Sequence, residues 1–167
     1  MPLIRNGAVA ENLFANVADG ETLPAGPAVV SLTRFLADRE TLLARNAPLG
    51  VRLKAEESPE ALGGDAQRLS LVVLEFPKFR DGRAFSWARM LRTRLGYRGE
   101  IRATGDFLYD QLAFMSRVGI DAFEVSEKIT PELLQRALAE MRFVYQPSAD
   151  GRRTIVQLRQ ATSLSEP

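Results

Sequence analysis

The chain has 167 residues, of which 46% are hydrophobic and 26% are charged, and its formal net charge is +1. This length and composition predict a single globular domain, and the near-neutral total argues against a broad polyanion-binding surface or nucleic-acid binding. Cysteine and histidine are both absent, which excludes disulfides and thiol chemistry and removes the usual zinc ligand and the commonest general base. Carboxylate-bound Mg²⁺ or Mn²⁺ is left open by this composition, but we expect no metal site and no cofactor.

The N-terminal stretch MPLIRNGAVAENLF lacks the apolar segment of a signal peptide. The longest interior apolar run is LVVL at 71–74, far below the roughly 20 residues that span a bilayer. We therefore expect a cytoplasmic protein without a membrane segment.

In chain order, residues 1–27 are predicted to form a hairpin and a lead-in. Asn6-Gly7 lies between two short apolar runs, which is typical of a tight two-residue hairpin turn. The turn-rich stretch 18–27 then leads into a predicted core at 28–126, and residues 127–167 are expected to supply a C-terminal helix and tail. All three parts are predicted to belong to one α/β domain.

Five short apolar runs in the core region read as strands. They cover residues 28–32, 49–54, 69–76, 100–104 and 121–125. Helical patterns follow them, with start signals predicted at Thr33, at Ser58-Pro59-Glu60, at Asp106 and at Thr130-Pro131-Glu132.

This alternation predicts a mainly parallel, open sheet of about five strands with helices on both faces. Five units are too few to close an eight-stranded barrel, and a partial (β/α) barrel is the alternative. The tail is expected to be extended, as two segments around an Asp150-Gly151 turn.

The stretch FPKFRDGRAFSWARMLRTRL at 76–95 concentrates positive charge, with Asp81 as its only acid. Ligands of parallel α/β sheets bind outside the carboxyl ends of the strands, which is where Lys78, Arg80 and Arg83 should lie. Basic residues before a helix N-terminus are unfavourable unless an anion binds there or acids neutralise them. Both interpretations stay open from the residues alone.

Arg102 is the second anomaly, because it lies in the middle of a strand that should be buried and therefore requires a charge partner. Glu75 and Asp110 are the expected partners, and the alternative is that Arg102 shares a ligand with Arg83. The predicted anion- or partner-binding residues are Lys78, Arg80, Arg83, Arg89, Arg102 and Asp106. Asp81, Asp110 and Gln111 are candidate supporting residues, and no catalytic residue is predicted.

The segment from 76 to 124 resembles the signature of the bacterial family known as domain of unknown function 934. The matching positions are Phe76, Pro77, Phe79, Asp81, Gly82, Arg83, Ser86, Arg89, Leu91, Arg92, Leu95, Gly96, Tyr97, Gly99, Gly105, Asp106, Asp110, Gln111, Arg117, Gly119, Asp121 and Phe123. A looser similarity covers nearly the whole chain.

The resemblance implies a role in sulfur assimilation, because members are labelled as oxidoreductases of sulfite reduction from the position of their genes. It supplies no catalytic residues, and the chain carries no thiol, histidine or dinucleotide motif. We therefore expect an accessory protein that meets sulfite reductase or another sulfur-assimilation enzyme, or a small oxyanion, through the basic surface 78–92. The alternative is a small enzyme with a phosphate or sulfur-oxyanion site at the strand ends.

Overall fold

The computed structural model describes residues 2–126 and 129–163. Within them the chain forms one curled, mixed sheet of eight strands in the order β2-β1-β8-β7-β6-β5-β4-β3. The strands are β1 (Leu3–Arg5), β2 (Ala8–Ala10), β3 (Ala15–Asn16), β4 (Ala28–Ser31), β5 (Leu49–Leu53), β6 (Leu71–Phe76), β7 (Glu100–Gly105) and β8 (Ala122–Glu124).

All five predicted core strands are present, as β4 to β8, but the sheet is larger than the predicted five strands. β3 adds a sixth parallel strand beside β4 through only two residues. The N-terminal hairpin forms around Asn6 and Gly7, both with positive φ, and it joins the same sheet because β1 pairs antiparallel with β8.

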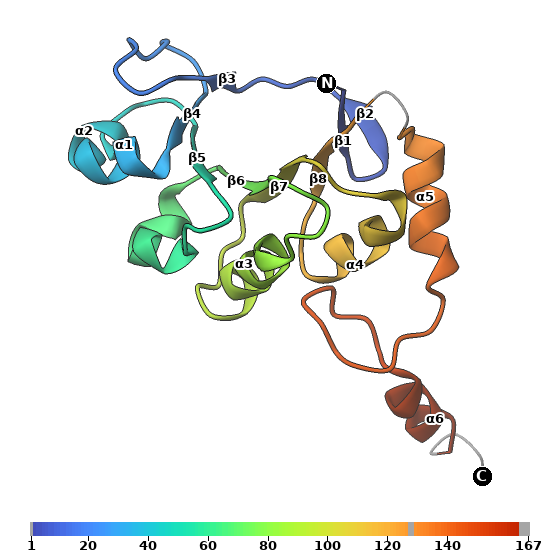
Figure 1. The fold of residues 1–167 in the computed structure, drawn as a ribbon. Helices are drawn as coiled ribbons and strands as arrows, with labels where there is room; N and C mark the ends of the chain where they lie inside the picture. The colour runs from blue at the N-terminus through green and yellow to red at the C-terminus, as the bar shows by residue number, and fades with distance from the viewer. Residues whose placement is uncertain (1, 127–128, 164–167) are drawn as a thin grey trace.

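The helices are α1 (Leu32–Ala37), α2 (Arg39–Leu43), η1 (Pro59–Arg68), α3 (Arg83–Thr93), η2 (Tyr109–Gln111), α4 (Leu112–Arg117), α5 (Pro131–Glu140) and α6 (Ile155–Ser163). From β3 to β8 the spatial order of the strands follows the chain. Right-handed crossovers that always advance in one direction place their helices on the same side of the sheet. The prediction of helices on both faces is therefore wrong, and the alternative of a partial barrel fits (Figure 1).

Most of the core lies between the sheet and these helices. Alternate strand residues such as Val72, Leu74 and Ile101 pack there with Ala88 and Leu91 of α3. The alternation is a direct result of the two-residue period of a strand.

None of the helices in residues 2–126 and 129–163 lies on the other face of the sheet, which is crossed by residues 11–17, here called the strap. The strap runs from β2 at one edge of the sheet to β3 at the opposite edge (Figure 1). Its Phe14 packs on a small cluster of Val29, Leu71 and Val73. A short length of chain thus replaces the second helical layer that we predicted.

Local capping explains where the helices begin. Ser58 accepts a hydrogen bond from the Glu60 amide and Thr130 accepts one from the Leu133 amide, so both predicted starts are confirmed. The start predicted at Thr33 is wrong, because Ser31 caps α1 instead, and the single predicted helix is broken at Asp38 into α1 and α2.

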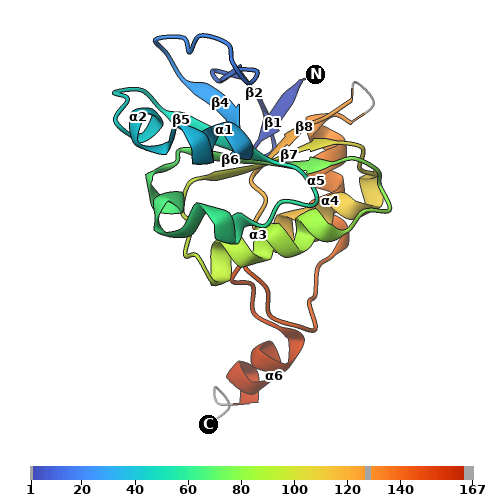
Figure 2. The same cartoon turned by 60° about the vertical axis from the view of Figure 1, so that its left-hand side comes forward.

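The prediction of an extended C-terminal tail is wrong in its last part. Residues 142–154 are irregular and turn at Asp150-Gly151, but the chain then forms α6. Thr154 and Gln157 cap this helix reciprocally: each backbone amide donates to the other residue's side-chain oxygen. Figure 2 shows α6 projecting away from the sheet and the other helices.

None of the helices in the described part of the chain is long and apolar enough to cross a bilayer.

Candidate functional site

The basic loop, residues 77–82, connects β6 to α3 and therefore lies at the carboxyl end of the parallel strands, as predicted. Two predicted residues hold its backbone. Asp106 Oδ2 accepts from the Phe79 amide at 3.4 Å, and Gln111 Nε2 donates to the Phe79 carbonyl at 2.9 Å. Asp106 therefore fixes this loop and does not cap a helix as we predicted, since the next helical turn begins after Leu108.

The charges of this loop are exposed. Lys78 and Arg80 form no ion pair with any described residue, and the Arg80 guanidinium lies 5.3 Å from the centre of the Phe79 ring. The first turn of α3 contains no acidic residue. Positive side chains therefore adjoin the positive end of the helix dipole. The carboxylate of Asp81, which precedes the helix and accepts the backbone amide of Arg83, is a counter-charge at that end.

Arg83 differs from its neighbours because it is paired. Its Nη2 lies 2.6 Å from Asp81 Oδ2, and its backbone amide and Nε both donate to Asp81 Oδ1. These hydrogen bonds from Arg83 lower the pKa of Asp81 from 3.8 to about 2. The same hydrogen bonds raise the pKa of Arg83, whose side chain remains 51% exposed.

We predict that Arg83→Gln raises the pKa of Asp81 from about 2 toward its ordinary 3.8, because the charged donor fork is lost. In the wild type, the stabilisation from this depressed pKa is present above about pH 4 and is lost as the pH falls through about 2. A carboxyl-carbon NMR titration of both proteins measures the shift. An unchanged Asp81 pKa in the variant would show that Arg83 is not its cause.

Arg89 lies away from the basic loop, whereas Asp110 directly precedes Gln111, which binds the loop backbone. Arg89 is exposed on α3, six residues after Arg83, which is about 9 Å along the helix axis. It borders a hollow of about 210 Å³ between α3, α4 and the tail. Asp110 borders a different hollow of about 230 Å³, beside Glu140.

Arg102 is fully buried on the helix-free face of the sheet, and its partners are not the predicted Glu75 and Asp110. Its Nη2 lies 2.8 Å from Glu100 and its Nη1 3.1 Å from Glu124. Nη1 also donates to Asn12 of the strap at 2.9 Å. The structure therefore places Arg102 in an internal charge network, on the face opposite α3 and Arg83.

This network is electrically balanced. Glu100 Oε2 also forms an ion pair with Arg5 Nε at 2.8 Å, and Glu124 Oε2 accepts a hydrogen bond from the Thr104 hydroxyl at 3.0 Å. Two arginines and two glutamates thus balance one another in charge and connect the hairpin, the central strands and the strap.

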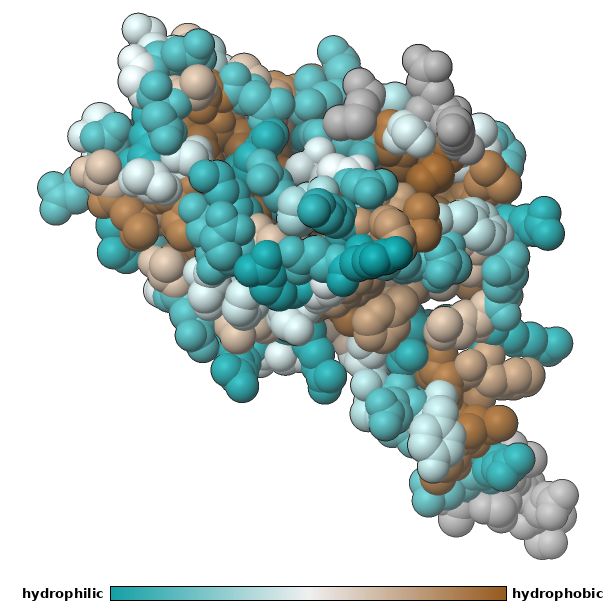
Figure 3. Space-filling model, viewed as in Figure 1, coloured by the Kyte–Doolittle hydropathy of each residue, from teal (hydrophilic) through white to brown (hydrophobic). Residues whose placement is uncertain are grey.

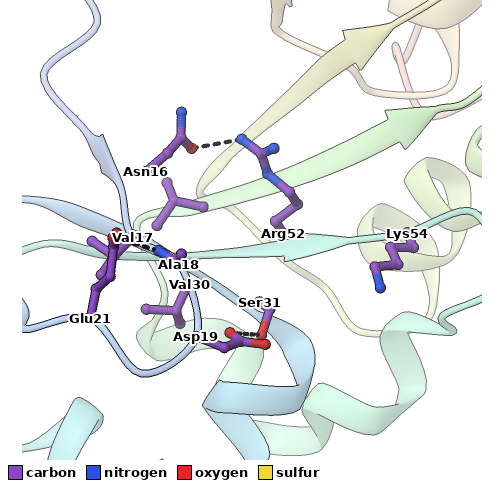
Figure 4. A pocket seen from close by; sticks show the side chains of 10 residues that line it. Asn16, Val17, Ala18, Asp19, Glu21, Val30, Ser31, Arg52 and Lys54 are labelled. Atoms are coloured by element: carbon purple, nitrogen blue, oxygen red, sulfur yellow. Dashed lines mark hydrogen bonds between the residues drawn. The ribbon is translucent and has the colours of Figure 1, made fainter.

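A further arrangement was not predicted: a polar hollow of about 510 Å³ at the carboxyl ends of β3, β4 and β5 (Figure 4). Its lining residues are Asn16, Val17, Ala18, Asp19, Glu21, Val29, Val30, Ser31, Arg52 and Lys54. A signal was available in the sequence, because Arg52 and Lys54 flank Leu53 at the end of a buried strand.

The C-terminal arm, residues 142–163, exposes apolar side chains beside arginines. Phe143 is 57% exposed and Tyr145 is 77% exposed, and Val156 of α6 is also exposed. Figure 3 shows hydrophobic residues along this arm. Arg117 of α4 anchors its base by pairing with Asp150 at 3.2 Å and by donating to the Gln146 carbonyl at 2.7 Å.

The fold and these surfaces define an α/β half-barrel protein with a basic loop and a polar hollow at the carboxyl ends of its strands. The profile of the family described as bacterial protein of unknown function (DUF934) matches residues 50–156, which is more than half of the chain. The chain belongs to that family, as its resemblance indicated. No curated protein shows a significant match to it.

Proposed function

We propose that the protein is an accessory factor of assimilatory sulfite reduction, and that its basic loop docks on an acidic surface of sulfite reductase or of another sulfur-assimilation enzyme. The observation that carries the docking role is the uncompensated charge of Lys78 and Arg80 on a loop whose backbone Asp106 and Gln111 hold. A fixed, exposed cationic surface favours fast and oriented association with an acidic partner. The link to sulfite reduction rests on the labels of family members.

The geometry favours docking over the alternative of an oxyanion-handling enzyme at the same residues. That alternative requires Lys78, Arg80, Arg83 and Arg102 to converge on one ligand. Arg102 is buried with Glu100 and Glu124 on the opposite face, and Arg83 is paired with Asp81. The exposed aromatic side chains of the arm also suit a protein partner, because aromatic residues and arginine are enriched in protein interfaces.

We predict that Lys78→Glu/Arg80→Glu weakens binding to purified assimilatory sulfite reductase of the same bacterium by about 100-fold or more, since two attractive charges become repulsive. Biolayer interferometry at low and physiological salt measures the effect. The melting temperature should stay near that of the wild type, because neither side chain has an ion pair with a described residue.

Arg94→Glu is the matched control. Arg94 is also exposed, and it lies near the far end of α3 beside Glu60. The Arg94→Glu variant should bind sulfite reductase like the wild type. A loss of binding free energy per reversed charge that is equal in Arg94→Glu and in the double variant would reduce the effect to net charge, and no binding by the wild type would refute this partner. Tight binding of free sulfate or sulfite at the basic loop would favour the enzyme alternative.

A further inference from the structure

We propose that the polar hollow at the ends of β3, β4 and β5 binds a small zwitterion of the α-amino acid type, with its oxyanion on Lys54 and its ammonium group toward the carboxylates of Asp19 and Glu21. This site is separate from the basic loop, and the inference does not depend on the proposed docking role. The hollow lies where parallel α/β folds bind ligands, outside the carboxyl ends of the strands. Its volume of about 510 Å³ falls within the range of small-molecule sites.

The walls of the hollow are fixed in place. Arg34 of α1 donates to the carbonyls of Ala18 and Glu21, at 2.8 and 2.7 Å. The Ser31 hydroxyl donates to Asp19 Oδ1 at 2.6 Å. The loop 17–21 is thereby held against the end of β4, so a ligand would meet a surface that is already ordered, at a small entropic cost.

The charges of the hollow are divided between two walls. Figure 4 shows Lys54, at the end of β5, on one side and the loop after β3, with Asp19 and Glu21, on the other. Arg52 of β5 lies between them and points toward Asn16. The lining charges sum to zero. A simple anion or a simple cation would satisfy one wall and face like charges on the other, whereas a zwitterion complements both.

These groups also have hydrogen-bonding capacity left. The Lys54 ammonium has no partner among the described residues, whereas Arg52 is engaged by Asn16 at 2.6 Å and by Glu75 at 3.4 Å. Each carboxylate uses one oxygen within the described chain, Asp19 Oδ1 for Ser31 and Glu21 Oε2 for the Ala18 amide. Three ammonium donors and two carboxylate oxygens are therefore available for a ligand.

The test is an amide NMR titration of the full chain with three classes of probe: the free L-α-amino acids, acetate and inorganic phosphate as anions, and ethylamine as a cation. We expect saturable shifts of the Ala18, Ser31 and Lys54 amides with at least one amino acid. The anions and ethylamine should produce no saturable shift there at equal concentration. Absence of saturation with every amino acid, or equal saturation with acetate or phosphate alone, would overturn the proposal.

Variants with matched controls locate the site. Lys54→Met should weaken binding of that amino acid by about tenfold or more, whereas Lys78→Met, the same exchange in the basic loop, should leave it unchanged. Glu21→Gln should also weaken binding of that amino acid through the lost charge, because glutamine keeps an oxygen that can accept the Ala18 amide. Glu11→Gln, the same exchange elsewhere, should leave binding unchanged. Equal affinity of Lys54→Met and Lys78→Met, with unchanged melting temperatures, would contradict the assignment.

Discussion

Replacing Arg102 with methionine is expected to destabilise the protein by about 3–5 kcal/mol, because removing one partner of a buried charge network leaves the others uncompensated. Glu100 would retain only Arg5 at 2.8 Å, and Glu124 would retain only the Thr104 hydroxyl among these partners. Asn12 Oδ1 of the strap would also lose Arg102 as a donor and keep only the Phe14 amide among these partners. Urea unfolding monitored by circular dichroism measures the loss.

Two further variants separate the loss of the buried charge network from the general effect of replacing an arginine with methionine. Arg94→Met removes an exposed pair, whose side chains are 70% and 61% accessible, and should cost no more than about 1 kcal/mol. Adding Glu124→Met to Arg102→Met should restore part of the stability, since it removes an unpaired buried charge. A loss below about 1 kcal/mol in Arg102→Met would show that the network contributes no more than a surface pair.

Gly105→Ala is expected to be similarly damaging, with a loss of more than about 3 kcal/mol, because a conformational cost adds to a backbone clash. Gly105 has a φ of +108°, and an added Cβ would lie 2.2 Å from the Phe76 carbonyl oxygen. That oxygen accepts the Asp106 amide at 2.7 Å. The substitution would therefore separate the ends of β6 and β7 and displace the residue that holds the basic loop.

Gly20→Ala is the control for backbone conformation alone. Gly20 has a φ of +87°, but no atom lies within 4 Å of an added Cβ. Its loss should be about 1–2 kcal/mol, the usual cost of a left-handed conformation for alanine. Both free energies of unfolding come from urea titrations. If the two variants lost equal stability, the close approach to Phe76 would have no energetic effect.

The strands and several helix starts were predictable because their signals are local. β4 to β8 correspond to short apolar runs, and Ser58 and Thr130 cap the helices that their sequence context indicated. Strand order and the layering of helices were not predictable, because the sequence does not state which strands pair. β3, at two residues, is too short for any periodicity to appear.

The errors at the site have the same origin. Asp106 follows a glycine at the end of a strand, a pattern typical of a helix cap, but contact with the Phe79 amide determined its role. Glu124 could not be predicted as a partner of Arg102 without the register of the sheet. Glu100 was within reach of sequence reasoning, because residues two apart on a strand lie on the same face.

The pairing of β1 with β8 has a consequence for how the chain folds as it is synthesised. Strands β4 to β8 each add beside their predecessor, so these units can assemble in order as they leave the ribosome. The first strand cannot, because Leu3 pairs with Glu124 at the far end of that series. The opening residues must remain unattached until β8 has emerged, so the sheet is completed only after about three-quarters of the 167 residues have left the ribosome.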